Sequence, residues 1–120
     1  MLYHFDCVYY YVSDMEQSIA FYRNILGFRL VSRDVVARFN VDGVLFELVP
    51  TTDRARLQGA GNARLALRVD SVETALQELA ARGVSVSPAE DKGTGILGFF
   101  RDPDENEICL WQYSSKATTT

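Results

Sequence analysis

One pattern of residues occurs twice along the chain, and this repeat limits the folds that the chain can adopt. The strand-like run 7–12 (CVYYYV) is followed by the pair 13–14 (Ser-Asp), and the run 64–69 (RLALRV) is followed by the pair 70–71 (Asp-Ser). After each pair the spacing of the apolar residues changes from the period of a strand to that of a helix. An internal repeat of this kind predicts two copies of one supersecondary unit.

Both predicted helices have a start signal in the sequence. Ser13 with Glu16, and Asp70 with Glu73, have the spacing of a capping box, which satisfies free N–H groups at a helix start. Asp in place of Ser or Thr makes the second box a variant. The helices are therefore expected to begin directly after residues 13 and 70.

Each predicted helix also has one apolar stripe and a glycine at its end. The residues expected to point inward are Met15, Ile19, Tyr22, Ile25 and Leu26 in the first helix, and Val72, Ala75, Leu76, Leu79 and Ala80 in the second. Gly27 and Gly83 follow, where a left-handed residue suits a helix C-terminus. The β-branched runs 28–32 and 84–87 come next and are predicted to be strands.

The two halves end alike as well. Asp42 and Asp104 each precede a strand-like run, and the fifth residue after each aspartate is Glu47 or Cys109. The order strand, helix, three strands is thus expected twice, which is an α+β fold of two βαβββ modules.

The repeat sets the domain boundaries. Residues 1–113 are expected to form a single domain, with module 1 at about 3–52 and module 2 at about 62–113. The segment 53–62, with little periodicity, is expected to be the linker between them. The polar residues 114–120 are expected to form a disordered tail.

Two fragments resemble a known family. The run 12–28 (VSDMEQSIAFYRNILGF) looks like the opening helix of the vicinal-oxygen-chelate family, which includes glyoxalases, bleomycin-resistance proteins and extradiol dioxygenases. The run 100–110 (FRDPDENEICL) looks like its closing hairpin, with Glu105 where the pattern usually has glycine. The resemblance implies curved mixed sheets that form a cup, in a homodimer. It leaves the reaction open, because function must be argued from the site.

Strand alternation predicts which side chains face the cup, because successive side chains point to opposite faces of a sheet. The residues expected on the cup face are Cys7, Tyr9, Tyr11, Leu45, Glu47, Val49, Arg64, Ala66, Arg68, Glu107, Cys109 and Trp111.

The family's metal-binding members place one ligand at each of four positions, which correspond here to Cys7, Glu47, Arg64 and Cys109. Only Glu47 is a typical ligand of the family, and the single histidine, His4, has the wrong parity. Arginine has no lone pair to donate and stays charged. We therefore predict no metal and no other cofactor. A zinc site of Cys7, Cys109 and Glu47 is the minority alternative, because thiolates are good zinc ligands.

Glu47 and Arg64 are expected to form a charge-assisted pair, which would be either a salt bridge closing a vestigial site or a polar anchor for a ligand. Arg68, on the same face, either assists or lies at the solvated rim. Cys7 and Cys109 are interpreted as small buried hydrophobes that also line the site.

Aromatic side chains on the cup face point to the kind of ligand. Tyr9, Tyr11 and Trp111 suit a flat, partly apolar molecule through stacking and a few oriented hydrogen bonds. The alternative is that they pack in a subunit interface, where aromatic residues are also enriched.

The function hypothesis is therefore a metal-independent, small-molecule binding protein of the sequestration or resistance type. The alternative is a lyase, isomerase or dioxygenase of the same family, with Glu47 as general base or metal ligand. A structural dimer with a vestigial cup is a third hypothesis.

Composition excludes other classes of partner. The net charge of −4 and the scattered basic residues argue against nucleic acid. No apolar run approaches the roughly 18 residues of a membrane span. The first residues lack the basic start of a signal peptide and two cysteines make no disulfide framework, so a cytoplasmic location is expected.

Overall fold

The computed structural model describes residues 4–57 and 65–114. It divides the chain into two compact units, residues 1–60 and 61–120. Each unit is an α+β module with one four-stranded mixed sheet, and the units are taken in turn.

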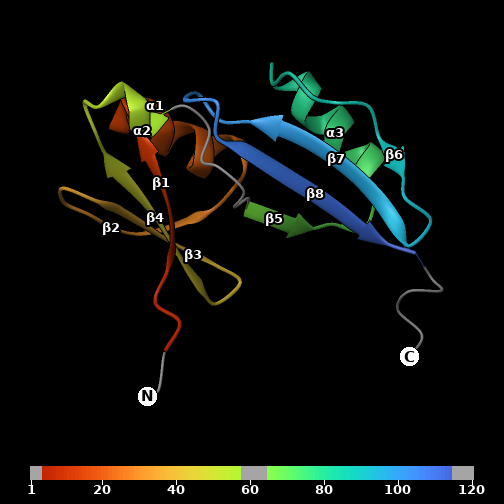
Figure 1. The fold of residues 1–120 in the computed structure, drawn as a ribbon, viewed down its shortest axis with the longest axis horizontal. Helices are drawn as coiled ribbons and strands as arrows, with labels where there is room; N and C mark the ends of the chain where they lie inside the picture. The colour runs from red at the N-terminus through yellow and green to blue at the C-terminus, as the bar shows by residue number, and fades with distance from the viewer. Residues whose placement is uncertain (1–3, 58–64, 115–120) are drawn as a thin grey trace. The chain divides into compact units, whose positions relative to one another are not determined.

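Unit 1 contains a sheet with the strand order β1-β4-β3-β2 (Figure 1). Its elements are β1 (Val8–Val12), α1 (Met15–Ala20), the π-helical segment η1 (Phe21–Ile25), β2 (Arg29–Arg33), β3 (Ala37–Val41), β4 (Val44–Pro50) and α2 (Arg54–Leu57). β1 runs parallel to β4, whereas the β2–β3 and β3–β4 pairs are antiparallel.

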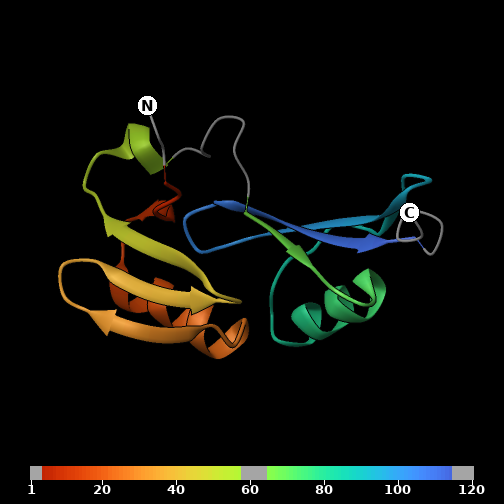
Figure 2. The ribbon, with the colours of Figure 1, turned by 90° about the horizontal axis from the view of Figure 1, so that it is seen from below.

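Unit 2 repeats this arrangement with the order β5-β8-β7-β6. Its elements are β5 (Leu65–Arg68), α3 (Val72–Ala81), β6 (Glu90–Asp91), β7 (Gly95–Arg101) and β8 (Glu107–Tyr113). β5 is parallel to β8, and the other two pairs are antiparallel. Figure 2 shows α3 along one face of this sheet. The prediction of two βαβββ modules is confirmed.

The predicted helix starts are wrong by one residue in both modules. Asp14, not Ser13, is the N-cap of α1, and its Oδ1 accepts a hydrogen bond from the amide of Gln17 at 3.1 Å. Ser71, not Asp70, is the N-cap of α3, and its hydroxyl accepts from the amide of Thr74. Each start offers two adjacent residues that can cap a helix, and in both modules the second of them is the N-cap.

The predicted helix ends are confirmed. Gly27 and Gly83 have φ values of 76° and 86°, in the left-handed region that glycine adopts without steric cost. The first helix reaches Gly27 through the wider turn of η1, where the amide of Leu26 donates to the carbonyl of Phe21.

Two predicted segments differ from the structure. The run 84–87 forms no strand and makes only an isolated bridge between Val86 and Phe100, and β6 lies further along as a two-residue strand. The segment 53–62 was expected to lack regular structure, but residues 54–57 form α2. Asp53 precedes this helix, and its Oδ1 accepts a hydrogen bond from the amide of Ala55.

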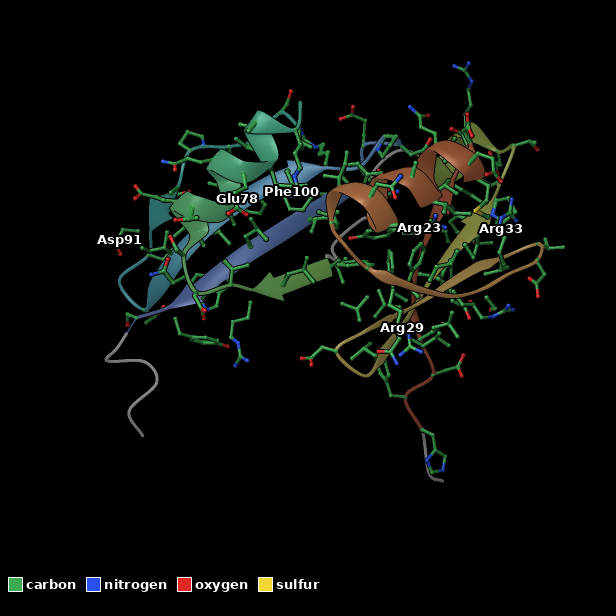
Figure 3. All side chains as sticks on the ribbon, turned by 180° about the vertical axis from the view of Figure 1, so that it is seen from behind. Arg23, Arg29, Arg33, Glu78, Asp91 and Phe100 are labelled. Atoms are coloured by element: carbon green, nitrogen blue, oxygen red, sulfur yellow. The ribbon has the colours of Figure 1, made fainter. Side chains whose placement is uncertain are left out.

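Strand alternation divides each sheet into a buried face and a second face, as predicted. In unit 1 the buried face of the sheet includes Tyr10, Val12, Ala37, Phe39, Phe46 and Leu48, and the buried apolar residues of α1 and η1 are Ile19, Phe21 and Tyr22. In unit 2 the buried hydrophobic residues are Val72, Leu76, Leu79, Phe100, Ile108 and Leu110. Phe100, labelled beside α3 in Figure 3, marks the face of β7 that the helix covers.

The inward stripes of the helices are only partly as predicted. Ala80 is exposed, and Met15, Ile25, Leu26 and Ala75 are half-buried. Phe21 and Ser18, which the stripe omitted, are buried instead. None of the described helices is long and apolar enough to cross a membrane.

Ser18 provides the first testable prediction. Its side chain is fully buried in α1, and its hydroxyl has no hydrogen-bond partner among the described residues. Burying an unpaired polar group is unfavourable, and alanine has the higher helix propensity. Ser18→Ala is expected to raise the free energy of unfolding by about 1 kcal/mol, measured by urea denaturation. An unchanged or lower stability would show that the hydroxyl is paired in solution.

Candidate functional site

The sheet of unit 1 has a face opposite α1, here called the site face, which contains the charged residues of the candidate site. Glu47 lies on β4 between the buried residues Phe46 and Leu48, so its side chain points to the site face. Arg38 lies directly opposite Glu47 in the β3–β4 pair. The Nε of Arg38 is 3.4 Å from the Oε2 of Glu47.

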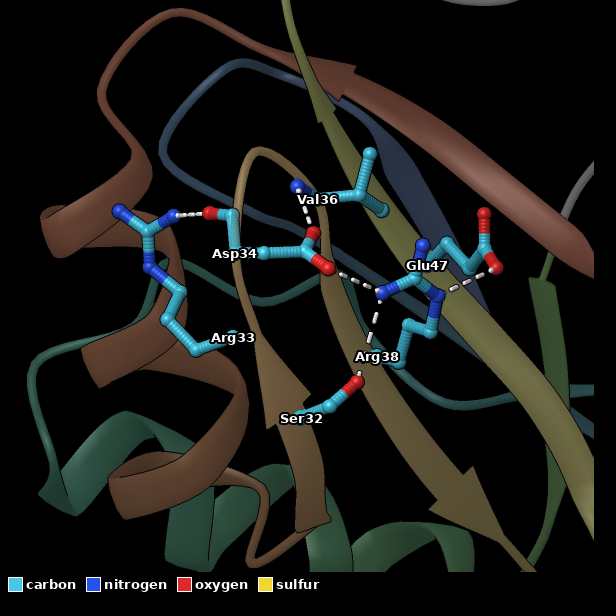
Figure 4. Close-up of polar contacts among 6 residues, drawn as sticks. All are labelled: Ser32, Arg33, Asp34, Val36, Arg38 and Glu47. Atoms are coloured by element: carbon cyan, nitrogen blue, oxygen red, sulfur yellow. Dashed lines mark hydrogen bonds and ion pairs between the residues drawn. The ribbon is translucent and has the colours of Figure 1, made fainter.

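Arg38 is the centre of a small polar network (Figure 4). Its Nη1 donates to the Oδ2 of Asp34 at 3.1 Å and lies 3.4 Å from the hydroxyl of Ser32. Asp34 in turn accepts from the amide of Val36 at 3.0 Å. The Glu47 side chain is 18% exposed, so the ion pair with Arg38 is partly shielded from solvent. One guanidinium therefore holds two carboxylates.

The electrostatics of this network follow from its contacts. The backbone hydrogen bond from Val36, followed by the contact with Arg38, lowers the pKa of Asp34. The carboxylate of Asp34, followed by that of Glu47, raises the pKa of Arg38. Both pKa shifts favour the charged forms of Asp34 and Arg38.

Two tyrosines from β1 form the aromatic part of the site face. The rings of Tyr9 and Tyr11 are edge to face, with centroids 5.5 Å apart. Tyr9 is 49% exposed, which is unusual for a large aromatic side chain. Hydrogen bonding to Tyr11 is the main cause of a raised pKa at Tyr9, so the phenol stays neutral.

Arg56 of α2 contacts one of these two tyrosines. The Nη1 of Arg56 donates to the hydroxyl of Tyr11 at 2.7 Å. The guanidinium carbon of Arg56 lies 5.0 Å from the centroid of the Tyr11 ring, within the range of a cation–π contact.

Cys7 lies just before β1 and beside Glu47. Burial raises the pKa of the Cys7 thiol, and the nearby carboxylates of Glu47 and Asp6 raise it further. The thiol is therefore protonated at neutral pH, which is opposite to what a nucleophile needs.

The remaining predicted site residues belong to unit 2. Cys109 and Trp111 lie on the face of β8 opposite α3, and Ala66 and Arg68 are their partners on β5. The Trp111 ring packs over Gly95, where a Cβ atom would overlap it, and meets the Tyr113 ring at 5.8 Å. Arg64 lies outside the described residues.

The structure thus brings the predicted residues together in two sets. Cys7, Tyr9, Tyr11 and Glu47 share the site face of unit 1, and Arg68, Cys109 and Trp111 share one face of unit 2. The predicted cup, which would join these sets, stays a prediction.

Sequence reasoning missed Arg38 and Arg56. A signal for Arg38 was available, because the tight Asp42-Gly43 turn fixes the register of the hairpin and places residue 38 opposite residue 47. No sequence signal pointed to Arg56, because the segment around it was taken as an irregular linker.

Comparisons with known proteins agree with this architecture. A family model described as the glyoxalase/bleomycin resistance protein/dioxygenase superfamily matches residues 4–110. The chain belongs to this superfamily.

Two relatives are similar to this chain over most of its length. YwkD of Bacillus subtilis, an uncharacterized protein, is 32% identical over 114 residues, covering 83% of this chain and 89% of its own. A lactoylglutathione lyase of Salmonella typhimurium is 29% identical, covering 82% of this chain and 84% of its own.

Solved structures of the superfamily have the same fold. TnmS3, an antibiotic binding protein from Streptomyces sp. CB03234, is 30% identical, with a TM-score of 0.74 over 94% of this chain and 98% of its own. The fosfomycin resistance protein FosX from Listeria monocytogenes has a TM-score of 0.81 over 100% of this chain and 99% of its own, at 19% identity. That likeness shows the fold alone.

Metal-binding members of this superfamily need a set of donor side chains, and the described residues do not fit that need. Among residues 4–57 and 65–114, no group of three or more His, Cys, Asp or Glu side chains is placed to hold a metal ion. Glu47, the one typical ligand, is held by a guanidinium.

Proposed function

We propose that this protein binds a flat organic molecule on the site face of unit 1 without a metal ion. Tyr9 and Tyr11 would form the stacking surface, and Glu47 with Arg38 the polar contacts. The observation that carries the proposal is the ion pair between Arg38 and Glu47, because it pairs the Glu47 carboxylate with a guanidinium instead of leaving it for a metal ion.

Charge is the reason for proposing metal independence. A divalent cation bound to Glu47 would lie beside the positive charge of Arg38, and like charges at that distance repel. Arg38 is also held by Asp34, so it is not free to move away at no cost. A neutral or polar ligand group meets no such repulsion.

The exposed aromatic pair supports an aromatic or amphipathic ligand. The ring of Tyr9 is exposed to solvent, and the ring of Tyr11 packs edge to face against it. The exposed ring of Tyr9 is therefore a surface on which an aromatic ligand can stack. The antibiotic-binding relative TnmS3 is in line with such a ligand at 30% identity.

The other predicted contacts belong to the same proposal. Arg64, Arg68, Cys109 and Trp111 would contribute from module 2, in a homodimer located in the cytoplasm. These features rest on the sequence and on the resemblance of the chain to its family.

The test is a thermal-shift screen of aromatic compounds on protein purified without chelator, together with elemental analysis. We expect far less than one metal per chain, and hits whose affinity does not change with EDTA. Loss of one stacking partner is worth about 1 kcal/mol or more, so Tyr9→Ala should weaken the hits about fivefold to tenfold by calorimetry.

Val35→Ala is the control, because Val35 is 74% exposed and lies away from the aromatic pair in the β2–β3 turn. Close to one metal per chain, lost in Glu47→Gln, would overturn the metal-independent proposal. Consumption of lactoylglutathione, the compound named for the Salmonella relative, would favour the lyase alternative instead.

A further inference from the structure

We infer that the ligand of this site is a planar anion, such as an aromatic carboxylate, and that Arg56 is the residue that selects it. This inference rests on the proposed function and goes beyond it, because it assigns the charge of the ligand and a residue of α2 to its recognition.

Arg56 has donors left for a ligand. Only its Nη1 makes a hydrogen bond within the described residues, to the Tyr11 hydroxyl at 2.7 Å. Its Nε lies 3.7 Å from the Oδ2 of Asp53, which is an ion pair beyond hydrogen-bond distance. A guanidinium has five N–H groups in a planar fork, and carboxylates bind such a fork through two hydrogen bonds. Because the Arg56 side chain is 54% exposed, the unused side of the fork is accessible.

Arg38, the other cation of the site face, cannot serve this purpose. It contacts the carboxylates of both Asp34 and Glu47, so one positive charge faces two negative ones. An anion approaching Arg38 would meet this net negative charge. On the described part of the site face, Arg56 is therefore the cation that an anion can approach.

The position of Arg56 also fixes the shape of the ligand. Its guanidinium carbon is 5.0 Å from the centroid of the Tyr11 ring, and Tyr9 meets Tyr11 edge to face. Cationic and aromatic surfaces are thus contiguous. A molecule with an aromatic ring next to a carboxylate can stack on Tyr9 while its charge reaches Arg56, and a compact anion such as phosphate would use only half of this surface.

The test compares two probes of nearly the same shape, 2-naphthoate and 2-naphthalenemethanol, by calorimetry at low salt. A charge-assisted hydrogen bond contributes more than a neutral one. We expect naphthoate to bind at least tenfold more tightly than the alcohol, and this ratio to fall as NaCl is raised. Arg56→Gln should bring the ratio near one, because naphthoate loses more affinity than the alcohol when the guanidinium is removed.

Arg54→Gln is the matched control, because Arg54 is an exposed arginine of the same helix. It removes the same charge from the chain and should leave the ratio unchanged. Arg56→Lys keeps the charge without the planar fork, and should retain only part of the preference.

The outcomes separate this inference from the proposed function. If both probes bind and Tyr9→Ala weakens both, but the ratio is near one or survives Arg56→Gln, the inference fails and the proposed function stands. An equal loss in Arg54→Gln would also overturn it, because general charge would then explain the preference. If neither probe binds and the screen finds no ligand, both are overturned.

Discussion

Replacing Phe46 with alanine is expected to lower the free energy of unfolding by about 3–5 kcal/mol, the usual cost of removing a buried aromatic ring. Phe46 is 1% exposed and lies among four other rings of unit 1. Its centroid is 5.0 Å from that of Tyr22 and within 6.2 Å of those of Tyr10, Phe28 and Phe39. The truncation would leave a cavity that these rigid rings cannot fill.

The chain offers a matched control for this substitution. Phe5 is 77% exposed, so Phe5→Ala should change stability by no more than about 0.5 kcal/mol. Both variants are compared by urea denaturation, with Phe46→Leu expected to lie between them. Equal effects of the two alanine variants would show that Phe46 is not at the centre of the core.

Replacing Asp102 with alanine is expected to cost roughly 2–4 kcal/mol, because it leaves buried donors without an acceptor. Asp102 is 4% exposed and organises the turn between β7 and β8. Its Oδ1 accepts from the amides of Asp104 and Asn106 at 2.9 and 2.8 Å, and its Oδ2 accepts from the Asn106 side chain at 2.8 Å.

Asp70→Ala is the control for Asp102→Ala, because Asp70 is exposed. Asp102→Asn keeps the shape of the side chain, but its NH2 group would face the N–H donors that the carboxylate accepts from. An intermediate loss of stability is therefore expected. Thermal unfolding followed by circular dichroism measures all three. A loss in Asp102→Ala no larger than that in Asp70→Ala would refute the role given to this turn.

The alternation of side chains was the most informative property of the sequence. It placed Tyr9 and Glu47 on one face of the sheet and Tyr10 and Phe46 on the buried face, in agreement with the strand pairing and burial, because a strand has a fixed period of two. The glycine stops at Gly27 and Gly83 were equally predictable, since a left-handed φ excludes most other residues.

Features that depend on competition between neighbours could not be predicted. Ser13 and Asp14 are both good caps, and the sequence gives no reason why the helix uses the second. Glu105 has a φ of 67°, in the left-handed region that favours glycine, at a position where the family pattern usually has glycine.

The sequence did not suggest Arg38 as a partner of Glu47, and the predicted pair of Glu47 with Arg64 stays a prediction. Glu47 was expected to meet Arg64, which lies outside the described residues, whereas the described ion pair is with Arg38. Arg38 is near in sequence and its position follows from the hairpin register. Arg56 reaches Tyr11 from a helix that has no periodic signal because it is one turn long.

The parallel pairing of β1 with β4 has a consequence for the order of folding. β2, β3 and β4 can pair through short turns, but β1 must close a loop that contains α1 and two strands before it meets β4. Loop closure of this kind slows the formation of non-local contacts. We therefore expect the strand that holds Tyr9 and Tyr11 to dock last in its sheet, and a ligand stacked on it to stabilise its docked form.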